Sequence, residues 1–81
     1  MSLACRAELT FRGEHAGVVA KAISPESSER IPRTSVSVEE DDGVLRVVVE
    51  ADDVSSLRAA LNSYIRWMHV AEETAKEASS R

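Results

Sequence analysis

The stretch from Asp52 to Arg81 constrains the fold most, because it contains no Gly or Pro and its apolar residues recur at helical spacing. Asp53 or Ser55 can accept hydrogen bonds from the first free backbone N–H groups of such a helix. At about 100° per residue the apolar positions cover an arc of roughly 160°, whereas a helix facing one core typically needs ~100°. The arc consists of Val54, Leu57, Ala60, Leu61, Tyr64, Ile65, Trp67, Met68, Ala71 and Ala75.

The length of this helix also predicts an unburied surface. A helix from about Val54 to about Ala78 would be ~37 Å long, whereas a strand of about seven residues spans only ~23 Å. Its last turns should extend beyond any sheet in this chain, and they carry Trp67, Met68, Val70 and Ala71. We therefore infer a surface that contacts another protein. The alternative is a monomer whose helix frays after Met68, with 72–81 as a frayed tail.

Length and composition predict a single domain over residues 1–81, because a chain of this size forms one small core. A domain this small buries only about 60% of the surface that its unfolded chain exposes, so association would add stability. The formal net charge of −4 disfavours a free-standing nucleic-acid binder. The chain has one cysteine and no segment typical of a signal peptide or a membrane span, so we expect a cytoplasmic protein.

The first half of the chain predicts a strand followed by a short helix. Apolar residues alternate from Leu3 to Phe11, which indicates a strand with one wet face. Glu14 to Ser24 has the spacing of a helix, and Glu14 near its start suits the helix dipole. The apolar positions of that helix are Ala16, Val19, Ala20 and Ile23, with Val18 and Ala22 on a second side. Ser24 to Pro32 is rich in Ser and Glu and contains both prolines, which predicts a loop.

The middle of the chain predicts a β-hairpin. Thr34 to Glu39 alternates, Glu40 to Gly43 has the composition of a turn, and Val44 to Ala51 is apolar on both faces. The last of these segments is the best candidate for the central strand. The prediction is an α+β fold with a three-stranded antiparallel sheet (β-α-β-β-α, order 2-3-1) and two helices packed on one face.

No group of residues has the spacing of a catalytic or metal site. His15 and His69 stand apart, without Cys or acidic partners at metal-ligand spacing, so surface or structural roles fit them best. Cys5 falls on the apolar side of a strand, where a buried, inert thiol is expected. The acidic run from Glu39 to Asp42 fits a solvated turn, and the glycines form no phosphate-binding pattern. We therefore expect no enzyme activity, no metal and no cofactor.

A polar stripe on the long helix has two interpretations. Arg58, Asn62 and Arg66 recur at every fourth position beside the apolar arc. They form either an ordinary solvated face or a basic ridge that contacts a phosphate backbone or an acidic partner.

The segment from Leu57 to Met68, LRAALNSYIRWM, resembles the signature of the Pcc family. Its members are small subunits of the KEOPS complex, and its animal relatives are the CTAG/LAGE proteins. The preceding strand, Asp52-Asp53-Val54 and Arg33-Thr34 also fit, and the likeness is strongest to the archaeal-type form. The order of elements is similar over nearly the whole chain, but only the helix motif is specific.

The resemblance implies a non-catalytic subunit that forms homodimers and binds the catalytic ATPase-like subunit of KEOPS. That subunit transfers a threonylcarbamoyl group to the adenosine beside the anticodon of tRNA, and the small subunit helps to hold the tRNA. We expect contacts to the catalytic subunit from Ala20, Ile23, Leu61, Tyr64, Trp67, Met68 and Ala71. Trp67 is the expected hot spot, and Arg33, Arg58 and Arg66 are the tRNA candidates.

The sequence leaves the dimer surface open. Pairing through the edge of the first strand is one option, and packing of the outer sheet face around Val44 and Val48 is the other. Two further functions stay open as well. One is an independent small RNA-binding module, and the other is a paralogue that occupies the subunit site and regulates dimerisation.

Overall fold

The structure is a computed structural model that describes residues 5–24 and 34–79. Leu3, Arg33 and most of the predicted loop from Ser24 to Pro32 lie outside these residues. The elements along the chain are β1 (Cys5–Arg12), α1 (Ala16–Ile23), β2 (Thr34–Asp41), β3 (Val44–Ala51) and α3 (Val54–Ser79).

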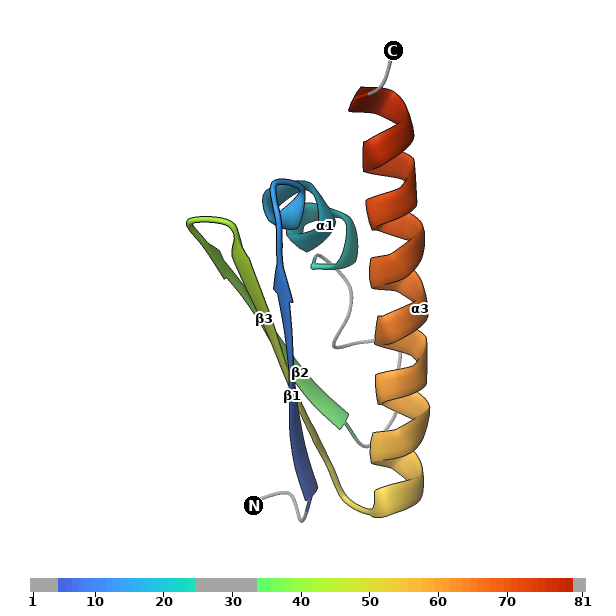
Figure 1. Ribbon diagram of the computed structural model, residues 1–81. Helices are drawn as coiled ribbons and strands as arrows, with labels where there is room; N and C mark the ends of the chain where they lie inside the picture. Colours follow the sequence, from blue (N-terminus) through green and yellow to red (C-terminus); the bar gives the residue numbers. More distant parts are fainter. Residues whose placement is uncertain (1–4, 25–33, 80–81) are drawn as a thin grey trace.

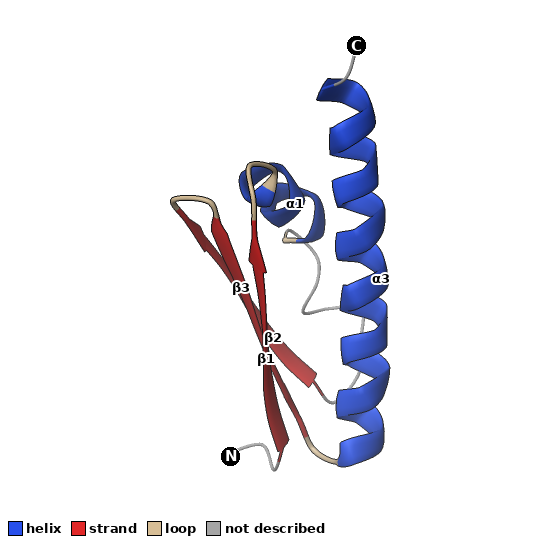
Figure 2. Cartoon of the chain, viewed as in Figure 1, coloured by secondary structure: helices blue, strands red, loops and turns tan. Residues whose placement is uncertain are grey.

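The three strands form one antiparallel sheet in the order β1-β3-β2, which confirms the predicted topology. Both helices lie on one face of this sheet, so the protomer has two layers (Figure 2). Strand β3 is central in the sheet, and its inner side chains fill the core. Leu45, Val47 and Val49 are each 0% exposed, whereas Leu9 on β1 and Val36 on β2 are only half-buried.

The β2–β3 hairpin closes on Asp42 and Gly43, with backbone φ angles of 52° and 80°. A two-residue turn with positive φ at both positions matches the right-handed twist of the paired strands. The backbone N–H of Gly43 lies 3.4 Å from a carboxylate oxygen of Glu40. The carbonyl of Gly43 accepts a 3.0 Å hydrogen bond from the N–H of Gly13, which joins the hairpin tip to the turn after β1.

Helix α1 is shorter than the sequence predicted, because it begins at Ala16 rather than Glu14. The N–H of Ala16 donates to the carbonyl of Gly13 at 3.2 Å, so residues 13–15 form a turn instead of a first helical turn. Glu14 therefore lies outside the helix. The buried residues are the predicted set of Ala16, Val19, Ala20 and Ile23, while Val18 on the second side is 55% exposed.

Helix α3 begins where the sequence predicted and is capped by Asp53. The N–H of Ser56 donates to Oδ1 of Asp53 at 2.7 Å, which decides between the two capping candidates. The helix continues without a break for 26 residues, or about 39 Å. Its last turns extend past the sheet and past α1, as the red, upper end of α3 shows in Figure 1.

Candidate interaction surfaces

Four of the seven predicted partner contacts lie within the core of the protomer. Ala20, Ile23 and Met68 are 6–8% exposed, and Tyr64 is 0% exposed. Leu61, Trp67 and Ala71 are half-buried and pack against this core. Only the last three therefore have surface left to offer another chain, and the core members can act only by supporting them.

The position of the half-buried Trp67 on α3 is fixed by its contact with the buried Tyr64. The rings of Tyr64 and Trp67 meet edge to face, with centroids 5.1 Å apart and an interplanar angle of 70°. Among the described residues the hydroxyl of Tyr64 has no hydrogen-bond partner, although it is fully buried. Tyr64 thus contacts Trp67 through its ring, and its hydroxyl forms no hydrogen bond with any other described residue.

The helix does not gather the predicted contacts on one side. At about 100° per residue, Leu61 and Trp67 lie roughly 120° apart, on either side of the buried Tyr64. We name two surfaces accordingly. The Leu61 flank consists of Leu61 and Ile65, and the Trp67 flank consists of Trp67 and Val70. Ile65 is 52% exposed and Val70 is 56% exposed, so each flank has an apolar side chain in solvent.

The basic stripe lies on the outer side of α3. Arg58, Asn62 and Arg66 are all exposed, and neither arginine makes an ion pair with any other described residue. Both guanidinium groups are therefore available to an external acidic group. Arg33, the third predicted tRNA contact, lies outside the described residues.

The outer face of the sheet, which the helices leave uncovered, is strongly charged. Oε2 of Glu8 lies 2.8 Å from Nε of Arg46, and Oε2 of Glu50 lies 3.9 Å from Nε of Arg6. These pairs link β1 to β3 around a shallow hollow lined by Arg6, Glu8, Ser37, Glu39, Arg46, Val48 and Glu50. No aromatic side chain belongs to this face among the strand residues described, so it lacks the stacking platform of a sheet-based RNA-binding module.

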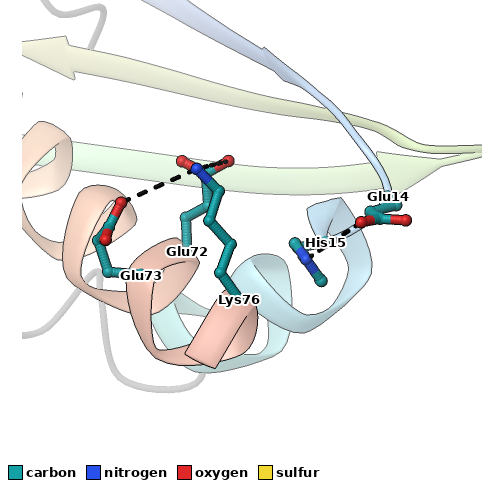
Figure 3. Close-up of polar contacts among 5 residues, drawn as sticks. All are labelled: Glu14, His15, Glu72, Glu73 and Lys76. Carbon is teal, nitrogen blue, oxygen red and sulfur yellow. Dashed lines mark ion pairs between the residues drawn. The ribbon is translucent and has the colours of Figure 1, made fainter. Parts of the chain in front are cut away.

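Two further ion-pair groups are local in sequence, and the described parts of the chain hold no cluster of His, Cys, Asp and Glu that could bind a metal ion. Nε2 of His15 lies 3.5 Å from Glu14, and Nζ of Lys76 lies 3.9 Å from both Glu72 and Glu73 (Figure 3). Cys5 is half-buried rather than buried, because β1 is an edge strand with a neighbouring strand on one side only. None of the described helices is apolar enough over its length to cross a bilayer.

Comparison with known proteins places this architecture in a family. Residues 4–76 match the model of the family described as Transcription factor Pcc1. The chain belongs to the Pcc1 family. The match spans both helices and all three strands, and it confirms the family resemblance inferred from the motif in α3.

A solved structure shares the fold of the family. The chain is similar to one in the crystal structure of the binary complex Gon7-Pcc1, with a TM-score of 0.82 and 22% sequence identity. The alignment covers 95% of this chain and 99% of the other. No curated protein matches the chain.

Proposed function

We propose that this chain is a non-catalytic, archaeal-type assembly and dimerisation subunit of the KEOPS complex. In this role it supports threonylcarbamoyl transfer to the adenosine beside the anticodon of tRNA, in the cytoplasm. The match of residues 4–76 to the Pcc1 family carries the proposal. Although the family is described as a transcription factor, the net charge of −4 disfavours DNA binding by the chain alone.

Binding of the catalytic ATPase-like subunit is assigned to the helix layer. Support comes from α3, which has exposed Ile65 on one flank and exposed Val70 on the other. Apolar side chains on a helix with free flanks suit packing against helices of a partner. Because Trp67 is held by the ring of Tyr64 and is still partly exposed, it loses little conformational entropy on binding. It therefore remains the expected hot spot.

Mixing the chain with the catalytic subunit and measuring the mass of the product by light scattering tests this assignment. Trp67→Ala should weaken the complex by about 2 kcal/mol, or roughly thirtyfold in Kd, if the Trp67 flank is the contact. Ile65→Ala on the opposite flank is the matched control and should leave the Kd within about threefold of the wild type. The reverse result would assign binding to the Leu61 flank, and unchanged binding in both variants would contradict the helix-layer assignment.

A thermal melt of each variant must accompany this measurement. Trp67 contributes to the protomer through its contact with Tyr64, whereas Ile65 is more than half exposed. If Trp67→Ala remains folded at the assay temperature, a loss of binding reports on the interface and not on the stability of the protomer.

A contribution to tRNA binding is assigned to Arg58 and Arg66, together with Arg33. Both described arginines are exposed and unpaired within the described residues, and guanidinium groups bind phosphate bidentately. In the assembled complex, Arg58→Ala should weaken tRNA binding, while Arg58→Lys keeps the charge and should recover part of it. Equal tRNA binding by the wild type and Arg58→Ala would remove Arg58 from the proposal.

The homodimer and the regulating paralogue make different predictions about stoichiometry. A dimerising subunit should bring two catalytic subunits into one particle, whereas a dimer-blocking paralogue should give a particle with one copy of each. Native mass spectrometry of the mixture distinguishes the two outcomes.

A further inference from the structure

The outer side of α3 carries positive charge with no acidic residue beside it over most of the helix. The chain has 14 acidic residues, yet none lies between Val54 and Ala71, and the first acid of the helix is Glu72. Arg58 and Arg66 lie within this acid-free span, and both are exposed. Their charge is therefore not neutralised by their own helix.

Asn62 lies midway between the two arginines and has no internal partner. At 1.5 Å per residue, Arg58 and Arg66 are about 12 Å apart along the axis, and Asn62 is about 6 Å from each. Each step of four residues turns the helix by about 40°, so the three side chains share one side. Asn62 is exposed, and its amide makes no hydrogen bond with any other described residue. The amide can therefore donate to and accept from an external group.

The lengths of these side chains make a notch, which consists of Arg58, Asn62 and Arg66. An arginine side chain is longer than an asparagine side chain, so the two guanidinium groups can extend further from the helix than the amide between them. The other neighbours of Asn62 on the helix surface are Ala59 and Ile65, three residues away on either side. Ala59 is exposed and has only a methyl group, which leaves the amide accessible from that side. Ile65 is exposed as well and offers an apolar contact on the other side.

We propose that Asn62 binds the 2′-hydroxyl of a tRNA ribose that lies between phosphates held by Arg58 and Arg66, so that the notch distinguishes RNA from DNA. The inference rests on the proposed contribution of the two arginines to tRNA binding and names the group that they bring to Asn62. Guanidinium groups bind phosphate oxygens bidentately. Along one strand of a nucleic acid the sugar lies between successive phosphates, so an amide between two phosphate-binding arginines faces a sugar and not a base.

The chemistry of the amide suits this sugar. The 2′-hydroxyl both donates and accepts hydrogen bonds, and the amide of Asn62 offers an acceptor oxygen and an N–H donor. In A-form RNA the 2′-hydroxyls lie in the wide, shallow minor groove, which side chains on the outer side of a helix can reach. DNA has the same phosphates but lacks the hydroxyl. The arginines therefore bind both nucleic acids, and Asn62 is the residue of the notch that separates them.

Fluorescence anisotropy on the complex assembled with the catalytic subunit tests the proposal. The probes are a tRNA transcript and a single-stranded DNA of the same sequence. Asn62→Ala should raise the Kd for tRNA by about fivefold, which corresponds to the loss of one hydrogen bond, and should leave the Kd for DNA within about twofold. The salt dependence should not change, because no charge is removed. Arg58→Ala should weaken binding of both probes and lower the slope of log K against log salt by about 1.

Thr74→Ala is the matched control, because it truncates an exposed polar side chain on another side of the same helix. Thr74 lies about 120° around the axis from Asn62 and about 18 Å along it. Its Kd for tRNA should stay within about twofold of the wild type. Both changes introduce alanine, the strongest helix former, so α3 should be retained, and circular dichroism checks this. Light scattering checks that each variant still binds the catalytic subunit.

The outcomes separate this proposal from the proposed function. Unchanged tRNA binding in Arg58→Ala removes that arginine from tRNA binding and overturns the notch with it. Weaker tRNA binding in Arg58→Ala, together with unchanged binding in Asn62→Ala, overturns the role of Asn62 alone. An equal loss of tRNA and DNA binding in Asn62→Ala means that the amide binds a group common to both, which overturns recognition of the 2′-hydroxyl. Loss of the catalytic subunit from Asn62→Ala assigns the notch to a protein interface and also overturns the proposal.

Discussion

Replacing Tyr64 with Phe should stabilise the protein, although it removes a polar group from a residue at the centre of the fold. Tyr64 is 0% exposed, and its hydroxyl has no hydrogen-bond partner among the described residues. A buried hydroxyl without a partner keeps the cost of its lost hydration. Phe retains the ring and its edge-to-face contact with Trp67, so the change removes the cost and leaves the packing in place.

The expected increase in the free energy of unfolding follows from the energetic cost of burying a polar group without a hydrogen-bond partner. Leaving a buried donor or acceptor unpaired costs about 1–3 kcal/mol. The space left by one oxygen atom reduces the gain, so we expect the free energy of unfolding to rise by about 1 kcal/mol. In a domain of this size such an increase corresponds to a rise in Tm of roughly 4–8 °C.

Urea unfolding followed by circular dichroism measures this difference at one fixed protein concentration, because the proposed dimerisation would make stability depend on concentration. Trp67 is the only tryptophan, so an unchanged fluorescence spectrum shows that the aromatic contact is preserved. An unchanged urea dependence shows that the same surface is exposed on unfolding. A loss of about 1 kcal/mol in Tyr64→Phe would refute the reasoning, since it would mean that the hydroxyl makes a favourable bond.

Three further predictions concern the hairpin, the core and the helix cap. Gly43→Ala should destabilise the protein by about 1–3 kcal/mol, because φ is 80° there, while Asp42→Gly should change stability by less than about 0.5 kcal/mol; urea unfolding compares the two. Leu45→Ala removes a fully buried side chain from the central strand and should cost about 2–5 kcal/mol in the same assay. Asp53→Ala should cost about 0.5–2 kcal/mol through loss of the cap, whereas Ser55→Ala should be nearly neutral by thermal melting.

The topology was predictable because the two kinds of periodicity in this sequence are clean. Alternation in the strands assigned one face of each to the core, and apolar residues on both faces of Val44 to Ala51 predicted a central strand. The structure confirms the order, with Leu45, Val47 and Val49 fully buried. The helix layer followed from the spacing of Val19 and Ile23 and of Tyr64 and Met68.

Which residues of α3 remain on the surface was less predictable, because the apolar arc does not indicate which parts of it are covered by the protomer itself. Tyr64 and Met68 are buried by the sheet and α1 together, and Leu61 and Trp67 are left on opposite sides of α3. The position of α1 beside α3 decides this division, and periodicity along one helix carries no information about its neighbour. The start of α1 was misplaced for a related reason, since the turn from Gly13 to His15 depends on a backbone hydrogen bond.

The length of α3 gives the protein a mechanical property. The sheet lies under its first turns, while its last turns project beyond the strands (Figure 1). A rigid rod of about 39 Å that tilts by about 5° at one end moves its other end by roughly 3 Å. A small change in the angle at which α3 packs on the sheet therefore produces a larger displacement at the C-terminal end of the helix. A subunit bound at that end would be displaced by structural changes in the strands.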